Sequence, residues 1–479
     1  MAFSSTTVWE VQTGGDDSNG GGFDPGVVAP GIDYSQQNSP EETYADLVID
    51  ATDSTKFTSV LNPVTDDHVG NVVNITSGTG FTVQRVVILS QSGGVATCDK
   101  SLGATSSVGG NGKLGGCLAT PSLANSLMVA SNICWIKSGT YILTSTITIA
   151  LASVARATRF FGYQTTRGDN TGTRPLITTA TDSTVLFTGS GNVSGYEWRN
   201  ISFSNTASTR ARGFRIAATN NCRSFVWKNC IFDGFTNAVE DDYDSVDYGV
   251  NGKVLIDCEV KNGTTNGIRV HGSTSIIGCY IHDNAGSGVY CGVNGSNSHA
   301  LSVSNTIITG NNVGVTLCVP IAIGISAGNG ASFINCVIAS NTTDGLILPT
   351  SSFDHHLCIT NSIIAYNGGY GVNYTKYPAV LVENNNAFIS NSSGNLYFGE
   401  NGSIDDSSVI LTGDPFTNKG SGDYSLNNTA GAGANCRASA FPGTMKGSTV
   451  GYLDMGVAQH QSSGSGVSSV ARRRGTVFL

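Results

Sequence analysis

One short pattern recurs six times between residues 229 and 364, and it constrains the fold more than any other feature of the sequence. Each copy starts at a polar or glycine residue and continues into a few β-prone residues. The copies begin at Asn229, Asp257, Gly278, Asn305, Asn335 and Asn361. Successive starts lie 21 to 30 residues apart, an interval typical of solenoids, in which each repeat stacks on the next.

A second set of short segments follows the first, several residues later in each repeat. These segments are led by glycine or alanine, and they begin at Ala238, Gly267, Gly288, Gly314, Gly345 and Gly371. No segment carries a helical period over a sufficient length, and asparagine and glycine mark the corners where the backbone must turn. The repeat therefore predicts an all-β chain, a right-handed parallel β-helix with about three strands in each coil.

Strand and turn spacing divide the chain into four parts. Residues 1–40 are rich in Gly, Asp, Ser and Pro, which is typical of an extended arm. Residues 41–118 hold short strands separated by Gly and Asp turns, a pattern that predicts a small β-barrel or sandwich. The β-helix is expected over residues 119–460, and residues 461–479 are expected to be a flexible basic tail.

Composition and charge argue against several classes of protein. The formal net charge is −9, and no basic stripe occurs before Arg472, so we expect no nucleic-acid partner. No run of 18 apolar residues exists, so we expect no membrane span. Residues 1–7 lack the basic start and apolar core of a secretory signal, which favours synthesis in a cytoplasm. Metal-site spacings such as C-x-x-C are absent, and we expect neither a metal nor a cofactor.

Four of the twelve cysteines share one position of the repeat, next to the corner residue. They are Cys230, Cys258, Cys279 and Cys336. We expect them to point inward as a stack of small thiols. Neighbouring coils lie about 4.8 Å apart, so a disulfide between Cys258 and Cys279 is geometrically allowed, although reducing synthesis favours free thiols.

Side-chain alternation along the glycine-led segments predicts one outward face. Glu240, Arg269 and Tyr290 fall on neighbouring coils of this face, and Asp242 lies beside His271 two residues further on. One interpretation is a carbohydrate site, in which paired carboxylates hydrolyse a glycosidic bond or Arg and His serve a lyase, with Tyr290 as a glycan contact. The other is cross-strand ion pairing beside a solvated acidic loop at residues 240–247, and we prefer it.

A second outward column mixes apolar and polar residues. It contains Ile231, Glu259, Tyr280, Ile307, Val337 and Ile363. This column is too apolar for a fully solvated face and too irregular for a core ladder. It predicts a partly buried face that packs against a loop or against another chain.

The two ends of the predicted solenoid carry a family resemblance. Residues 132–149 form two strands around a Ser-Gly-Thr-Tyr turn, and residues 452–459 read Tyr-Leu-Asp-Met-Gly-Val-Ala-Gln. These segments resemble the first and last coils of the pectate-lyase-like β-helix superfamily. Chains of that superfamily typically end on an Asp-x-Gly-Ala strand, whereas here Val457 precedes the alanine.

The arrangement of a β-helix shaft, a separate N-terminal β domain and an arm at each end resembles bacteriophage tailspikes and other virion surface proteins. This resemblance implies a structural virion component, either a tailspike or fibre or a protein that decorates the capsid. It further implies a homotrimer, made in the host cytoplasm, that contacts host glycans or neighbouring virion proteins. The alternative is a polysaccharide-degrading enzyme, a lyase or glycoside hydrolase, that acts on a groove of the β-helix. We prefer the non-enzymatic interpretation.

The basic C-terminal tail provides a test of the virion interpretation. Arg472, Arg473, Arg474 and Phe478 place a basic triplet before an apolar end, which predicts a peptide that docks on a partner, the alternative being a frayed end. We expect a chain without residues 463–479 to be missing from purified virus particles, as measured by co-purification. Unchanged incorporation of the shortened chain would contradict this prediction.

Overall fold

The computed structural model describes residues 3–151, 157–170, 172–189, 193–217, 223–242, 251–270, 273–292, 300–317, 329–348, 355–374, 380–398, 407–437, 439–440 and 454–458. Over these residues the chain is mostly β, and the predicted combination of a parallel β-helix and an N-terminal β domain is confirmed. By its contacts the chain forms two compact units. The first contains residues 1–142, 151–178 and 194–202, and the second contains the rest. No helix in the described ranges is long and apolar enough to span a membrane.

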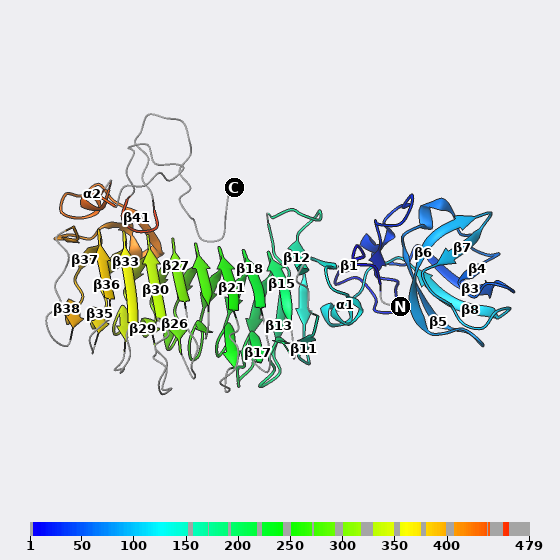
Figure 1. Cartoon of the computed structure of the whole chain (residues 1–479), viewed down its shortest axis with the longest axis horizontal. Coiled ribbons are helices and arrows are strands. Elements are labelled where there is room, and N and C mark those ends of the chain that lie inside the picture. The colour runs from blue at the N-terminus through cyan, green and yellow to red at the C-terminus, as the bar shows by residue number, and fades with distance from the viewer. Residues whose placement is uncertain are drawn as a thin grey trace, which may run out of the picture. The chain divides into compact units, whose positions relative to one another are not determined.

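A closed six-stranded barrel makes up much of the first unit, drawn in blue in Figure 1. Its order is β3-β4-β7-β6-β5-β8, with antiparallel neighbours. The strands are β3 (Glu42–Ile49), β4 (Lys56–Thr58), β5 (Val72–Ser77), β6 (Gln84–Ser92), β7 (Val95–Cys98) and β8 (Val108–Leu114), with the short helix η2 (Asp66–His68) between β4 and β5. Tyr44, Leu47, Phe57 and Ile88 belong to its buried core. The small domain predicted for residues 41–118 is therefore a barrel.

The first unit also holds parallel strands that begin the solenoid. They are β1 (Val8–Val11), β9 (Ile133–Lys137), β12 (Thr158–Tyr163) and β15 (Ser194–Arg199), and β10 (Thr140–Ile142) pairs with β13 (Leu176–Thr179). Helix α1 (Pro121–Leu127) comes before β9, and Thr120 caps it by accepting a hydrogen bond from the backbone of Leu123.

Residues 1–40 differ from the extended arm that the sequence suggested. Strand β1 pairs in parallel with β9 and antiparallel with β2 (Gly22–Phe23), and the 3-10 helix η1 spans Tyr34–Gln36. Trp9 is fully buried. Glu10 is also buried and lies 2.8 Å from Arg167 Nε, while Arg167 Nη1 lies 2.6 Å from Asp33. Burial raises the pKa of Glu10, and the guanidinium opposes that shift. The composition predicted an extended arm, but an apolar strand and a buried ion pair fix this segment.

Three parallel sheets stack coil on coil in the second unit, as Figure 1 shows. The first sheet contains β18 (Arg223–Lys228), β21 (Asn251–Ile256), β24 (Thr274–Ile277), β27 (Ala300–Ser304), β30 (Asn329–Ile334), β33 (His355–Thr360) and β36 (Val380–Asn384). The second contains β16 (Ser202–Asn205), β19 (Ile231–Asp233), β22 (Glu259–Lys261), β25 (Tyr280–His282), β28 (Ile307–Thr309), β31 (Val337–Ala339), β34 (Ile363–Ala365), β37 (Ala387–Ile389) and β39 (Val409–Ile410). The third contains β11 (Ile147–Ile149), β14 (Phe187–Gly189), β17 (Phe214–Ala217), β20 (Val239–Asp242), β23 (Ile268–Val270), β26 (Ser287–Cys291), β29 (Val313–Leu317), β32 (Leu346–Leu348), β35 (Tyr370–Tyr374) and β38 (Gly394–Phe398).

The register of the third sheet agrees with the predicted stacking. Val239 pairs with Ile268, Ile268 with Val289, and Val289 with Val315, and these side chains are fully buried. The four stacked cysteines are buried as expected, and each is a free thiol, so Cys258 and Cys279 form no disulfide.

Asparagines form two columns with different structural roles. At the corner between the first and second sheets, the left-handed residues are Asn229, Asp257, Gly278, Asn305, Asn335, Asn361 and Asn385, with φ between 49° and 64°. At the turn between the second and third sheets, a buried ladder runs through Asn284, Asn311, Asn341, Asn367 and Asn391. In the ladder each Nδ2 donates to the Oδ1 of the next asparagine, at 2.8 to 3.2 Å.

The ladder explains the glycines that lead the strands of the third sheet. A Cβ at Gly314 would lie 2.3 Å from the carbonyl oxygen of Gly345 and 2.9 Å from Asn341 Nδ2. A side chain there would push the coils apart, so only glycine permits this spacing.

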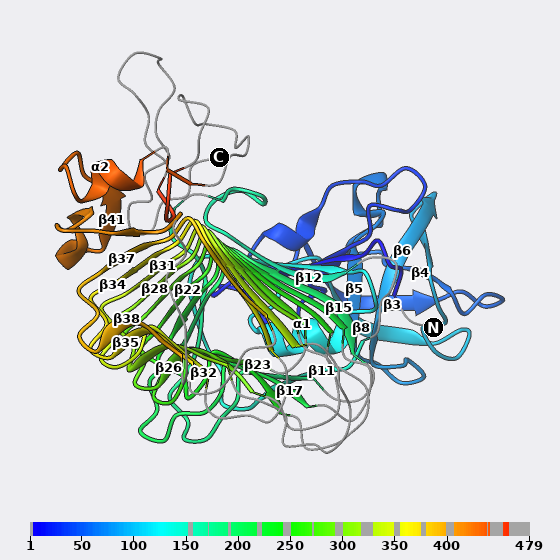
Figure 2. The same ribbon diagram turned by 60° about the vertical axis from the view of Figure 1, so that its left-hand side comes forward.

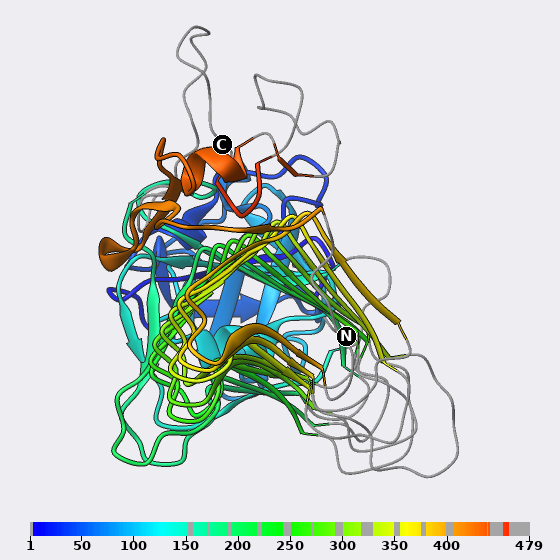
Figure 3. The same ribbon diagram turned by 90° about the vertical axis from the view of Figure 1, so that its left-hand side faces the viewer.

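A closing segment covers the outer face of the second sheet. It contains β40 (Phe416–Asn418), η3 (Lys419–Ser421), β41 (Asp423–Leu426) and α2 (Gly433–Cys436), and it is drawn in orange beside β37 and β34 in Figures 2 and 3. Phe416, Leu426 and Met455 pack in one cluster with Val337 and Ile363. The mixed column is therefore partly buried by a segment of the same chain, which was one of the two expected covers.

Replacing Asn311 with alanine should destabilise the second unit. The change removes the Nδ2 donor to Asn341 Oδ1 and the Oδ1 acceptor for the backbone N–H and Nδ2 of Asn284. Buried polar groups of both neighbours lose a partner, at a cost of about 1–3 kcal/mol. The free energy of unfolding from chemical denaturation measures this loss. Asn312→Ala is the matched control, because the Asn312 side chain has no hydrogen-bond partner among the described residues, and it should change stability by less than about 0.5 kcal/mol. Equal losses in both variants would contradict the ladder's role.

Candidate functional site

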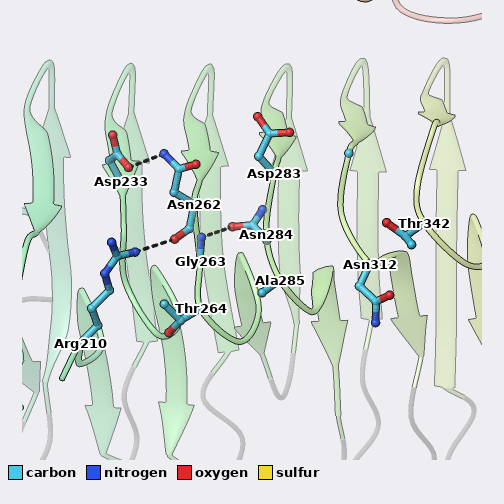
Figure 4. Close-up of a pocket in the computed structure, with 11 residues that line it drawn as sticks. Arg210, Asp233, Asn262, Gly263, Thr264, Asp283, Asn284, Ala285, Asn312 and Thr342 are labelled. Atoms are coloured by element: carbon cyan, nitrogen blue, oxygen red, sulfur yellow. Dashed lines mark hydrogen bonds between the residues drawn. The ribbon is translucent and has the colours of Figure 1, made fainter. Parts of the chain in front are cut away.

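An open groove of about 770 Å³ crosses the turns between the second and third sheets of the second unit. Figure 4 shows side chains from successive coils along it. The polar residues Arg210, Asp233, Asn262, Thr264, Asp283 and Asn312 contribute to its lining, together with Thr342. The buried ladder lies within the same turns, and Asn284 belongs to both the ladder and the groove lining. The hydrogen-bonded ladder therefore fixes the spacing of the groove's turns from Asn284 onward, and the hydrogen bond from Gly263 to Asn284 ties the preceding turn to it.

One side of the groove is held by hydrogen bonds between coils. Arg210 Nη1 donates to the carbonyl oxygen of Asn262 at 3.1 Å, and Asn262 Nδ2 donates to Asp233 Oδ1 at 2.7 Å. Gly263 donates its backbone N–H to Asn284 Oδ1 at 2.8 Å. These bonds, dashed in Figure 4, fix a cation, an amide and a carboxylate near one another.

The rim of the groove at Asp283 belongs to a charged cluster. His282 is buried, with Nδ1 2.7 Å from Asp283 Oδ2 and Nε2 3.2 Å from Glu259 Oε1. The Tyr280 ring stacks on the imidazole, with the ring centroids 4.0 Å apart. The hydrogen bond from His282, followed by that from Lys261, lowers the pKa of Glu259 to about 2. The contact with His282 fixes the position of the Asp283 carboxyl group beside the groove.

Several polar side chains of the groove are not used by the fold. Thr264, Asn312 and Thr342 make no side-chain hydrogen bonds to any described residue. Their hydroxyl and amide groups project from the turns that follow β22, β28 and β31, and they meet solvent. Donors and acceptors at fixed spacing with no internal partner are available to a ligand.

The predicted outward face of the third sheet centres on Glu240. Glu240 is directly opposite Arg269 in register, and Arg269 is opposite Tyr290, as the sequence predicted. Glu240 is 1% exposed: Arg269 Nη1 lies 2.9 Å from Oε1 and Arg212 Nε lies 2.6 Å from Oε2. Asn237 donates a further hydrogen bond to Oε2. The Arg269 guanidinium lies 5.8 Å from the centroid of the Tyr290 ring.

This geometry makes Glu240 an anchor for two arginines. Both of its oxygens accept from, or pair with, neighbouring side chains, and water has almost no access. A general acid or a nucleophile needs an oxygen that can reach its substrate, and Glu240 offers none. The ion-pairing interpretation of this face therefore fits the geometry better than the catalytic one.

The remaining predicted site residues are not brought together by the described structure. The backbone of Asp242 ends strand β20, but its side chain lies outside the described residues, as do His271 and residues 243–247. Arg472, Arg473, Arg474 and Phe478 also lie outside them. Among the described residues, no group of three or more His, Cys, Asp or Glu side chains is placed to hold a metal ion.

Sequence reasoning missed the groove. Its residues are threonines, asparagines and aspartates in turns, where such residues are common for conformational reasons alone. The available signal was the polar residue directly after β22 and β25, at Asn262 and Asp283, and the second of the paired asparagines after β28, at Asn312. Ordinary turns carry the same residues, so this signal does not identify a groove. It does so only once the structure shows which asparagines are buried in the ladder and which are exposed.

Solved structures of other proteins resemble this chain at low sequence identity. No family model matches this sequence, and no curated protein matches it. The pectate lyase Pel9A structure is 11% identical and covers 72% of this chain and 92% of its own, with a TM-score of 0.47. The A-module of the mannuronan C-5 epimerase AlgE4 from Azotobacter vinelandii is 11% identical, with coverage of 62% and 77% and a TM-score of 0.41. The catalytic domain of a GH87 α-1,3-glucanase is 11% identical, with coverage of 78% and 89% and a TM-score of 0.33. The chain is a parallel β-helix protein, and at these identities the likeness concerns the fold alone.

Replacing Glu240 with glutamine should reduce stability. The substitution removes the anion between Arg212 and Arg269 while keeping the shape, and because both guanidiniums are about a third exposed, water can compensate in part. We expect the free energy of unfolding to fall by about 1–3 kcal/mol. The exposed Glu41→Gln is the control and should change it by less than about 0.5 kcal/mol. A Glu240→Gln variant with wild-type stability would contradict the anchoring role.

Proposed function

We propose that this protein binds a polysaccharide along the groove between the second and third sheets. The observation that carries the proposal is the row of hydroxyl and amide side chains at Thr264, Asn312 and Thr342, which the fold itself does not use. The lined turns belong to six consecutive coils, and five spacings of about 4.8 Å give a length of roughly 24 Å. An extended chain of sugars suits such a site better than a compact ligand does.

The chemistry of the lining favours uncharged sugars. Sugar hydroxyls both donate and accept hydrogen bonds, and the groove offers acceptors as well as donors. Asp233 and Asp283 accept, while Arg210 and the amides of Asn262 and Asn312 donate. Two fixed carboxylates would repel a uronate in this groove. Because the ladder holds the turns rigid, little conformational entropy is lost when a sugar chain binds.

The geometry favours binding over cleavage. Asp233 and Asp283 lie two coils apart, about 9.6 Å by the spacing of coils. This is well beyond the separation of about 5–5.5 Å that retaining glycosidases use and at the upper limit of the range for inverting ones. Each is also engaged, Asp233 by Asn262 and Asp283 by His282. The enzyme alternative, in which the groove degrades its ligand, is therefore the second candidate. It is favoured only by the presence of two carboxylates on one groove.

The biological setting stays a prediction. A polysaccharide-binding β-helix fits the proposed virion surface protein, which would contact host glycans. The proposed homotrimer and the proposed binding to other virion proteins belong to the same hypothesis. Copy number and location are independent of the groove argument. The groove proposal applies equally to a monomer and to an oligomer that leaves these turns open.

Affinity measurements on the groove test the proposal. The full chain is titrated calorimetrically with neutral glycans, such as glucans and galactans. We expect the double variant Thr264→Ala, Asn312→Ala to bind the responding glycan at least tenfold more weakly, because it removes two hydrogen-bonding side chains. Ser302→Ala, on the exposed face of the first sheet, is the matched control and should bind like the wild type.

Two outcomes would count against the binding proposal. Undiminished affinity in the double variant would remove the groove as the site. New reducing ends or unsaturated products with the wild type, and none with Asp233→Asn, would replace binding by the enzyme alternative.

A further inference from the structure

A strip of aromatic and cationic side chains lies on the outer face of the first unit's parallel sheet. Trp135 of β9 is opposite Phe161 of β12, and Phe161 is opposite Arg199 of β15, so the three form one column. Arg159 of β12 lies beside the column, two residues from Phe161. The strip consists of Trp135, Arg159, Phe161 and Arg199, and neither the groove nor the Glu240 cluster includes any of them.

The rings of the strip are partly open to solvent. Trp135 and Phe161 meet edge to face, with ring centroids 5.2 Å apart and an interplanar angle of 70°. Both are half-buried, whereas Trp9, Trp198 and Trp227 are completely buried. A half-exposed tryptophan beside a half-exposed phenylalanine is a surface on which a flat or ring-shaped ligand can stack.

Two guanidiniums face the same phenylalanine. Arg199 Cζ lies 4.8 Å from the Phe161 ring centroid and Arg159 Cζ lies 5.9 Å from it. Arg199 is 46% exposed and pairs with Glu197. Arg159 has no ion pair with any described residue, and its buried Nε has no hydrogen-bond partner among them. Glu197 is opposite Arg159 in register but pairs with Arg199, so a negatively charged ligand would give the partly buried Arg159 an ion-pair partner.

We propose that this strip is a second carbohydrate site, which binds a sugar that carries a carboxylate. The sugar ring stacks on Trp135 and Phe161, and the carboxylate pairs with Arg159 and Arg199, which supply two cations against the single carboxylate of Glu197. Nucleic acid also combines rings and negative charge, but a net charge of −9 and Glu197 within the strip disfavour a polyphosphate. The site is independent of the groove, whose carboxylates select uncharged sugars.

Tryptophan fluorescence of the full chain tests the site directly. The chain is titrated with oligogalacturonate and, separately, with the same oligomer fully methyl-esterified, which keeps the rings and removes the charge. We expect a saturable change in emission with the acidic oligomer and at least tenfold weaker binding of the ester. Trp135→Phe should abolish the optical change, because the other three tryptophans are shielded from solvent.

Variants separate this site from general charge effects and from the groove. Arg199→Gln and Phe161→Leu should each weaken binding of the acidic oligomer at least tenfold, with unfolding checked by circular dichroism. Lys56→Ala, which removes a partly exposed cation of the barrel, should bind like the wild type. The groove variant Thr264→Ala, Asn312→Ala should also leave this titration unchanged, so that failure of one site is distinct from failure of the other.

Three results would overturn the proposal. They are equal binding of the acidic and esterified oligomers, wild-type affinity in Arg199→Gln, and an emission change with oligo(dT) that exceeds the change with the sugar. The last result would identify the strip as a surface for single-stranded nucleic acid instead.

Discussion

The hydrogen-bonded chain of buried asparagine amides is the constraint on which the second unit depends. From Asn311 to Asn391 each side-chain Oδ1 accepts hydrogen bonds from both the backbone N–H and the Nδ2 of the ladder asparagine one coil before it. The buried polar groups of the ladder are therefore paired. A ladder of this kind tolerates no slip of register. A shift of one residue would bury other side chains and leave the asparagine amides without hydrogen-bond partners. The close approach at Gly314 follows from the same spacing. The groove residues Asp283, Asn312 and Thr342 lie in the turns that this ladder spaces.

The charged groups of this protein divide into those that serve the fold and those that remain available. Glu10 with Arg167, and Glu240 with Arg212 and Arg269, are buried carboxylates whose oxygens are all engaged. Burial without these partners would cost several kcal/mol, so their role is explained by the fold. Asn312 and Thr342 in the groove, and Arg159 on the strip, have side chains to which the described structure gives no such partner. Availability, and not the presence of a carboxylate, is the property that marks a binding surface on a solenoid of this kind.

Each unit also shows how a stack of strands is protected at its exposed faces and edges. Strand β1 adds to β9 from a segment whose composition suggested no core, and the ion pair of Glu10 with Arg167 holds it in place. In the second unit the closing segment buries Val337 and Ile363, which an open face would leave as an apolar patch. Lys419 contributes to that closure, with its ammonium 3.2 Å from the Tyr366 ring centroid and 2.7 Å from Asp414. The terminal segments thus remove the surfaces that would otherwise favour association of sheets.

The sequence by itself determined the coiled architecture, the register of Glu240 with Arg269, the inward cysteines and the partly buried mixed column. Repetition makes those features readable, since a fixed period aligns each residue with its neighbour one coil away. The tertiary structure alone decided that Glu240 has no free oxygen, that asparagines split into a corner column and a buried ladder, and that Trp135, Phe161 and Arg199 stack. Arg212 reaches Glu240 from a turn outside the repeat, and Trp135 and Phe161 belong to coils whose spacing is irregular. Contacts of that kind depend on the path that the turns give the backbone. The period of the sequence repeat does not determine that path.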